Sequence, residues 1–462
     1  MQKRIYFFLL TVLLLVSTGF GCKGLSAEQQ ASIAPVRLNY WTISNDVDQL
    51  KAFASAYQQL RSYVTVTVRQ VRAEEFDTLF LNALADATAP DIISIDPRKL
   101  PVYQARLIPM PSSVTVSTIT VTGRYAKETV VTTSQEPMPS AAAVKKNYIG
   151  TVASDVISGN SVYGLPLAID TMAIYYNKDL LDRGGVAEPP KTWAEFLDAV
   201  KKTTAFDSAG RITQSGAALG TGKNIAYAPD IFALLVMQNG LKIIDAGVPS
   251  FTYGLGGTAA ENHPTMEALR FYTDFARPTK EAYAWNGKME EAFDAFVRGK
   301  AVFYFGFAGD YARVKQRAPQ MNLEVMPMLQ LNDAQPVNGA KYWIESVVKK
   351  SKHQNEAWDF VRFMTTPNNI KTYTAKTRKA TPLRAQITEQ SADPTLGPFA
   401  AQVLNAANWY KGRDPERARR AITEMIDAVV EPQGGATSTP AFDVGRMVNE
   451  LSKAAQVIQQ TL

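Results

Sequence analysis

Apolar and polar residues follow two alternating spacings along the first hundred residues of the chain. Apolar residues at every second position predict strands, and apolar residues at intervals of three and four predict helices. Strand patterns cover 36–41, 64–69 and 91–95, and helix patterns cover 47–57 and 74–85. The third strand is almost entirely apolar, which is typical of a strand buried in a parallel sheet. This alternation of strand and helix predicts an α/β fold.

The same pattern resumes after residue 165. Strands are expected over 172–176, 302–305 and 342–348, and helices over 192–200, 289–296, 355–365, 415–430 and 442–461. Thr192 and Glu195 have the spacing of a capping box, which predicts where the first of these helices begins. Arg417, Arg419 and Arg420 are expected to lie on a solvated helix face rather than at a phosphate site.

A segment rich in threonine and valine, 112–133, interrupts the α/β pattern. Alternating β-branched residues on both sides of a break at Gly123 predict a β-hairpin. We interpret this segment as an insertion in the first part of the fold.

The N-terminus has the order of charge and hydropathy that marks a secretory signal peptide, predicted over 1–21. Lys3 and Arg4 precede an apolar run over 5–16 and then a stretch of small residues. Twelve residues of helix measure about 18 Å, which is too short for the ~30 Å hydrocarbon core of a bilayer. We therefore expect an exported protein.

Cys22, the only cysteine in the sequence, directly follows this segment. A lone cysteine cannot form an internal disulfide. Gly19-Phe20-Gly21-Cys22 resembles the bacterial lipobox, although Gly19 stands where leucine is usual. The resemblance implies that Cys22 becomes the lipid-modified mature N-terminus and that 22–35 is a flexible tether. It also implies an extracytoplasmic protein that the lipid anchors to the cell membrane. An incidental thiol is the alternative.

Composition and charge exclude several other classes of function. The chain is 46% apolar and 20% charged, which is typical of a globular protein. Its net charge of +6 falls to +4 without Lys3 and Arg4, too mild an excess for a nucleic-acid partner. With one cysteine and only His263 and His353, Cys/His zinc sites and Cys-His nucleophilic pairs are not expected. We predict neither a metal nor a cofactor.

Several segments resemble the family 1 extracellular solute-binding proteins, which include maltose-binding proteins. They are LPLAIDTMAIYYNKDLL at 165–181, PPKTWAEFLDAV at 189–200, FVRGKAVFYFG at 296–306 and ESVVKKSKHQNEAWDFVRFMTTP at 345–367. The resemblance implies a two-lobed periplasmic-binding-protein-like α/β fold with a ligand cleft between the lobes. Lobe one is expected over 36–164 plus 345–380, and lobe two over 165–344 plus 382–462. The resemblance also implies a monomer that captures a small solute for an ABC importer permease. A sugar or oligosaccharide is expected first of all, and a polyol, a sugar phosphate or a short peptide is the alternative.

Candidate ligand-binding residues follow from strand ends and from these segments. Ligands bind beyond the carboxyl ends of strands in open α/β sheets, and the predicted crossings between lobes border the cleft. The candidates after the first and third strands are Trp41, Ser44, Asn45 and Asp96. Those at a crossing are Tyr342, Trp343 and Glu345, and the others are Asp170 in the LPLAID segment, Trp285 and Phe307. Phe307 is a candidate stacking platform because the tryptophan usual in the family is missing after this strand.

Two other functions stay open from the sequence. An exported glycoside hydrolase would use paired carboxylates, but no spacing in the chain singles out such a pair. A surface lipoprotein without a ligand is the second alternative. Because the recognisable segments are those of binding proteins, we predict a binding protein without catalytic residues. For Trp41 and Trp343 the alternative to a place in the ligand site is a place in the hydrophobic core.

Overall fold

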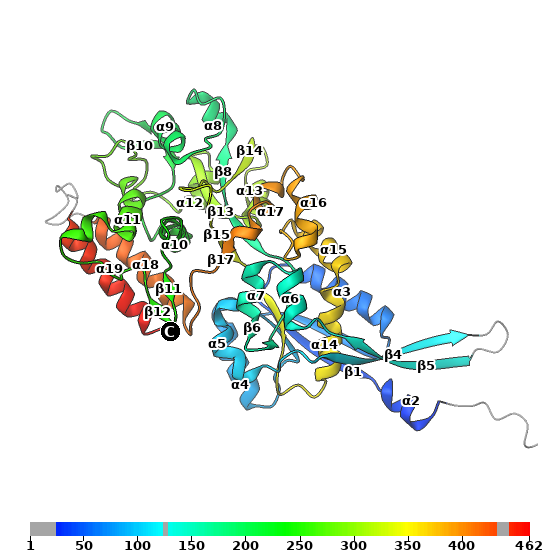
Figure 1. Ribbon diagram of the computed structural model, residues 1–462. Helices are drawn as coiled ribbons and strands as arrows, with labels where there is room; N and C mark the ends of the chain where they lie inside the picture. The colour runs from blue at the N-terminus through cyan, green and yellow to red at the C-terminus, as the bar shows by residue number, and fades with distance from the viewer. Residues whose placement is uncertain (1–24, 123–127, 432–442) are drawn as a thin grey trace, which may run out of the picture.

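Two α/β lobes, each built around its own β-sheet, make up the computed structural model, which describes residues 25–122, 128–431 and 443–462 (Figure 1). Lobe one has a four-stranded sheet in the order β16-β3-β1-β2. These strands are β1 (Val36–Thr42), β2 (Val64–Gln70), β3 (Ile92–Ile95) and β16 (Ile344–Val347). β1 pairs in parallel with β2 and β3, whereas β16 returns from lobe two and is antiparallel to β3.

Helices with one apolar face cover the sheet of lobe one. They are α3 (Val47–Leu60), α4 (Ala73–Ala85), α5 (Leu100–Tyr103), α6 (Ala141–Asn147), α7 (Gly150–Val156), α14 (Gln354–Met364) and α15 (Pro367–Thr377). In α3 the buried residues are Leu50, Phe53, Ala54 and Tyr57, the three-and-four spacing expected from the sequence. Tyr57 contacts Phe360 of α14 with ring centroids 5.1 Å apart, so residues far apart in sequence share one core.

Lobe two contains a larger sheet with two buried central strands. Its order is β17-β15-β8-β13-β10-β9, and β14 also pairs with β8. The strands are β8 (Asp170–Asn177), β9 (Ala205–Phe206), β10 (Ile212–Ala217), β13 (Ala301–Phe307), β14 (Leu323–Pro327), β15 (Asn338–Lys341) and β17 (Ala406–Ala407). Every residue of β8 and β13 is buried, which explains the continuous apolar runs over 172–176 and 301–305 within them.

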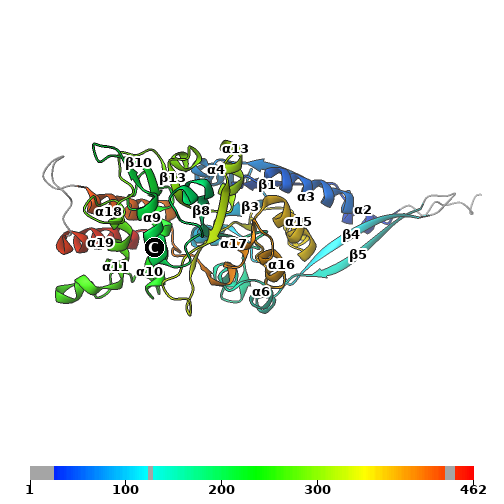
Figure 2. The ribbon, with the colours of Figure 1, turned by 90° about the horizontal axis from the view of Figure 1, so that it is seen from above.

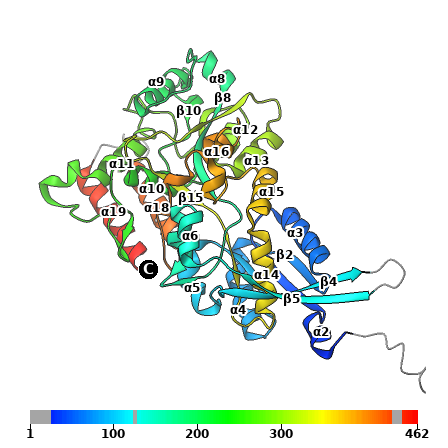
Figure 3. The ribbon, with the colours of Figure 1, turned by 45° about the vertical axis from the view of Figure 1, so that its right-hand side comes forward.

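The helices of lobe two surround this sheet. They are α8 (Lys178–Arg183), α9 (Trp193–Thr203), α10 (Ala228–Gln238), α11 (Pro264–Asp274), α12 (Ala292–Val297), α13 (Gly309–Arg317), α16 (Ile387–Ser391), α17 (Gly397–Ala400), α18 (Pro415–Val430) and α19 (Val444–Gln459). The last two pack side by side at the outer end of the lobe (Figure 3).

One predicted helix start is confirmed and another is shifted, each for a local reason. Thr192 does cap α9, since its Oγ1 accepts a hydrogen bond from the Glu195 N–H at 3.2 Å. The Glu195 carboxylate, however, accepts from the Lys191 N–H at 2.7 Å, so the capping box is incomplete. The helix expected from residue 289 begins at Ala292, because Glu291 caps it by accepting N–H bonds from the first turn.

Three chain segments cross between the lobes and hydrogen-bond to one another. The Leu165 N–H donates to the Glu345 carbonyl at 3.2 Å, and the Glu345 N–H donates back at 2.9 Å. The Ile169 N–H donates to the Ala380 carbonyl at 2.9 Å. The single strand expected over 342–348 is wrong, because the chain leaves one sheet after Lys341 and joins the other at Ile344. We keep the predicted lobe boundaries as a proposal.

The segment rich in threonine and valine forms a separate two-stranded ribbon that projects from lobe one (Figures 1 and 2). β4 (Ser113–Thr122) pairs with β5 (Glu128–Pro137), so the second strand continues past the predicted end at residue 133. The Asn355 side chain of α14 holds the base of the ribbon, since it bonds both the N–H and the carbonyl of Thr115 at 2.7 Å. Gly123 lies outside the described residues.

Part of the predicted tether is a short helix, α2 (Ala27–Ser32). A complete capping box between Ser26 and Gln29 explains why this polar stretch is helical. Gln29 also donates through Nε2 to the Val131 carbonyl of β5 at 3.4 Å. Cys22 and the predicted signal peptide lie outside the described residues. Among the residues that the structure does describe, no helix combines the length and apolar character needed to cross a bilayer.

Candidate ligand-binding site

Two adjoining cavities lie where the lobes meet the crossing segments. The larger, cavity one, measures about 370 Å³, and the smaller, cavity two, about 180 Å³. They share five lining residues: Ile43, Tyr227, Phe307, Lys341 and Trp343. Ile43 follows β1 of lobe one, Tyr227 and Phe307 belong to lobe two, and Lys341 and Trp343 lie at a crossing. The two cavities are therefore neighbouring parts of one site that both lobes and a crossing build.

Strand direction explains why these side chains meet. Ile43 and Asp96 follow the carboxyl ends of β1 and β3, which are parallel neighbours and end at the same edge of the sheet. Phe307 ends β13, and Asp170 begins β8. Because β8 and β13 are antiparallel with Phe307 paired to Met172, the start of one lies beside the end of the other.

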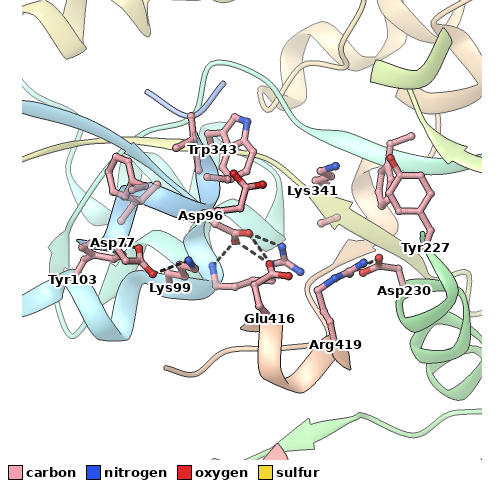
Figure 4. Close-up of a pocket in the computed structure, with 18 residues that line it drawn as sticks. Asp77, Asp96, Lys99, Tyr103, Tyr227, Asp230, Lys341, Trp343, Glu416 and Arg419 are labelled. Atoms are coloured by element: carbon pink, nitrogen blue, oxygen red, sulfur yellow. Dashed lines mark hydrogen bonds and ion pairs between the residues drawn. The ribbon is translucent and has the colours of Figure 1, made fainter. Parts of the chain in front are cut away.

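Paired charges line cavity one (Figure 4). On the lobe-one side, Arg98 donates through Nε and Nη2 to Asp96 Oδ2 at 2.9 and 2.5 Å. On the lobe-two side, Arg419 of α18 forms an ion pair with Asp230 of α10. Burial acts to raise the pKa of Asp230, but the charges of Arg419 and Arg98 outweigh it and the pKa is lowered. Asp230 is therefore held as a carboxylate.

Buried carboxyl groups line cavity two. Asp170 accepts hydrogen bonds from the backbone N–H groups of Ala308 at 2.7 Å and Gly309 at 3.2 Å. Burial raises the pKa of Asp170 to about 6, although these N–H bonds oppose the shift. Glu345 accepts from the Tyr40 hydroxyl at 2.5 Å and the Ser94 hydroxyl at 2.6 Å, both at Oε2. Burial raises the pKa of Glu345 to about 7.

Most of the residues proposed from the sequence gather around the two cavities. Of the ten candidates, the seven that line them are Asn45, Asp96, Asp170, Phe307, Tyr342, Trp343 and Glu345. Asp96 also caps the turn that follows it, because its Oδ1 accepts from the Arg98 N–H at 2.9 Å. This side chain therefore caps a turn and also has a place in the cavity wall.

The other three candidates, Trp41, Ser44 and Trp285, are not among the residues that line either cavity. Trp41 lies inside β1 rather than after it, and the Arg69 guanidinium covers its ring at 4.8 Å from the centroid. Ser44 is buried and its hydroxyl donates to Asp46 at 3.1 Å. Trp285 has no exposed surface, and its Nε1 donates to Asn224 Oδ1 at 3.3 Å. These contacts give the three side chains structural partners and no place in the wall of either cavity.

Several cavity residues were not proposed from the sequence. Tyr227 lies directly before α10, and Pro229 in the first turn of that helix is a start signal that could have located it. Arg419 was expected on a solvated face, but its partner Asp230 comes from a distant part of the chain. Lys341 ends a short strand without any local motif. Among the described residues, no three His, Cys, Asp or Glu side chains form a group that could hold a metal ion.

Comparison with known proteins relates this chain to a family of binding proteins. Residues 49–397 match the family model described as bacterial extracellular solute-binding protein. The maltodextrin-binding protein MdxE of Bacillus subtilis is 26% identical over 276 residues, which are 53% of this chain and 60% of that protein. The glycerol-3-phosphate-binding protein UgpB of Agrobacterium fabrum is 24% identical over 229 residues, 48% of this chain and 49% of that one. The chain thus spans about half the length of several curated relatives.

Solved structures share the fold. The sugar-binding protein MalE of Xanthomonas citri superposes with a TM-score of 0.69 at 16% identity, over 92% of this chain and 98% of that one. This likeness confirms the two-lobed α/β fold expected from the sequence. Because the family model covers most of the chain, the protein belongs to the bacterial extracellular solute-binding proteins, a family of binding proteins and not of enzymes.

Proposed function

We propose that the protein binds a sugar or oligosaccharide in the two cavities and delivers it to an ABC importer, as a monomer anchored by lipid at Cys22. The observation that carries this proposal is the aromatic lining contributed by a crossing segment and by lobe two. Trp343 and Tyr227 are half-buried, so they keep ring surface available at the cavities. Solved proteins of the same fold supply further support, since two of them hold mannobiose and maltotriose.

The chemistry of the lining suits a carbohydrate. Flat rings cover the C–H faces of a sugar, and charged and amide groups can bond its hydroxyls, which would otherwise be buried unpaired at a cost of ~1–3 kcal/mol each. Phe307 and Trp343 border both cavities, and Asn45 and Asp96 supply polar groups from lobe one. Lobes joined by crossing segments can close on such a ligand by rotation at the crossings.

Replacing Trp343 by alanine tests the proposed site. We expect the affinity to fall by at least ~2 kcal/mol, or roughly thirtyfold, because stacking aromatics concentrate binding energy. Isothermal titration of the full chain with a panel that contains mannobiose, maltotriose and maltotetraose provides the measurement. Trp41→Ala is the matched control, since this tryptophan lies outside both cavities and should affect stability more than affinity.

Two outcomes would contradict the proposal. If wild-type protein binds no member of a broad sugar panel, the proposed ligand class is wrong. If Trp343→Ala binds as tightly as wild type while Trp41→Ala loses binding in its folded form, the ligand lies elsewhere than in these cavities.

A second variant, Cys22→Ala, tests the proposed anchor. Removing the only thiol of the chain should shift the protein from the membrane fraction to the soluble fraction, since no acyl chain could be attached. Fractionation of cells followed by immunoblotting gives the readout. A variant that stays on the membrane as firmly as wild type would rule out lipid attachment at this position.

A further inference from the structure

We infer that the solute carries an anionic group, and that Lys341 holds this group at the junction of the two cavities. The inference rests on the proposed function, because it concerns the ligand of the same cleft. It narrows the ligand to acidic sugars, either uronates or sugar phosphates. Their shared chemistry is a negatively charged oxygen beside a ring with hydroxyl groups.

The pairing of charges around the cavities singles out Lys341. The basic side chains that line them are Arg98, Lys99, Arg313, Lys341, Lys379 and Arg419. Five have a carboxylate partner, in the pairs Arg98–Asp96, Lys99–Asp77, Arg313–Asp310, Lys379–Asp46 and Arg419–Asp230. Within the described parts of the chain, the Lys341 ammonium makes neither an ion pair nor a hydrogen bond. Among the described residues of the lining, Lys341 is therefore the one cationic side chain whose charge is left for a ligand.

The position of Lys341 suits recognition of a ligand. Its Nζ lies 5.4 Å from the ring centroid of Tyr227 and 5.3 Å from that of Phe307. These cation–π contacts support the ammonium without using its N–H donors. Figure 4 shows Lys341 between Trp343 on one side and Tyr227 on the other. The side chain is exposed and belongs to the lining of both cavities, so a ligand in either one can reach it.

The nearby carboxyl groups explain why the partner must come from outside. Asp170 lines the same cavity, but its two oxygens accept the N–H groups of Ala308 and Gly309. Asp310 is engaged by Arg313. Glu345 accepts from the Tyr40 and Ser94 hydroxyls. Glu74 and Glu416 border only cavity one, where they would repel an anion, whereas Asp170, Asp310 and Glu345 of cavity two are each engaged by protein donors. We therefore expect the anionic group of the ligand on the side of cavity two.

Closure of the lobes makes the pairing important. A bound ligand removes water from the ammonium, and burying a charge is costly unless the charge is paired and hydrogen-bonded. A neutral hydroxyl restores hydrogen bonding but adds no negative charge, and Asp170 acts on the Lys341 charge only through space, without a direct ion pair. An anionic oxygen restores both, so an acidic sugar should bind more tightly than its neutral counterpart of the same shape.

Titration calorimetry on the full chain with matched solutes tests this inference. Glucose is compared with glucuronate and with glucose 6-phosphate, and these two anionic solutes distinguish a carboxylate from a phosphate. Glycerol is compared with glycerol 3-phosphate. We expect at least one anionic solute to bind tenfold or more tightly than its neutral counterpart. Lys341→Met should abolish this preference, and Lys341→Arg should retain it.

Lys99→Met is the matched control, because Lys99 lines cavity one but is paired with Asp77 at 3.1 Å. This variant should keep the anionic preference of wild type. Equal affinities for neutral and anionic solutes, or a preference that survives in Lys341→Met, would overturn the inference while leaving sugar binding intact. Binding of glycerol 3-phosphate with no sugar bound would support Lys341 and contradict the proposed function. If the protein binds neither these solutes nor the neutral oligosaccharides, both the inference about Lys341 and the proposed function are wrong.

Discussion

Replacing Trp285 by alanine is expected to lower the free energy of unfolding by about 3–5 kcal/mol, the usual cost of truncating a buried tryptophan. Trp285 has no exposed surface, so its removal leaves a cavity in the core of lobe two. The substitution also removes the Nε1–H that bonds Asn224 Oδ1. Urea denaturation monitored by circular dichroism measures the change, with the midpoint and slope fitted separately.

Trp343→Ala is the matched comparison for this prediction. Its side chain is half-buried and borders both cavities, so the stability loss should be smaller and the loss of affinity larger. Trp285→Ala protein that is folded should bind ligand nearly as well as wild type. A stable Trp285→Ala variant with strongly weakened binding would show that Trp285 contacts the ligand. That result would contradict the position of this residue in the core of lobe two.

Replacing Glu345 by glutamine is expected to change how stability depends on pH. Burial raises the pKa of Glu345 from 4.5 to about 7, so the folded protein binds this proton more tightly than the unfolded chain does. The stabilisation is complete below pH 4.5 and is lost as the pH rises through 7. Glutamine mimics the protonated acid and still accepts from Tyr40 and Ser94. At pH 8 the variant should be more stable than wild type by on the order of 3 kcal/mol.

Denaturation curves for both proteins between pH 4 and pH 8 give the measurement. The advantage of Glu345→Gln should shrink towards acid pH, while a smaller slope of the same sign remains from Asp170, whose pKa is raised to about 6. Glu267→Gln, which removes an exposed carboxylate on α11, controls for the change in net charge. Parallel stability profiles for wild type and Glu345→Gln would show that burial does not hold the proton on this group.

Local spacing determined much of the fold. The helix α3, the strands β1 to β3 and the buried pair β8 and β13 are each indicated by which positions are apolar, because a regular element places those positions on one face. Segments that resemble the family pattern, in the same order along the chain, then predict two lobes. The likeness to solved structures confirms that prediction.

The ends of elements were less predictable, since they depend on single contacts. Glu291 moves the start of α12 by capping it, and a register that pairs Ser113 with Pro137 lengthens the hairpin. The break between β15 and β16 has no local signal, because Tyr342 and Trp343 are apolar and continue the pattern that leads into Ile344 of β16. Only the positions of the two sheets require the chain to leave one and join the other there.

Membership of the cleft was decided by the tertiary structure. The predicted crossing selected Trp343 and the LPLAID segment selected Asp170, and both line cavity two. Sequence position could not distinguish them from Trp41 or Trp285, which have similar neighbours in sequence but are covered by Arg69 and by the core of lobe two. Burial and charge pairing arise between residues far apart in the chain, whereas hydropathy patterns report only on neighbours within a few turns.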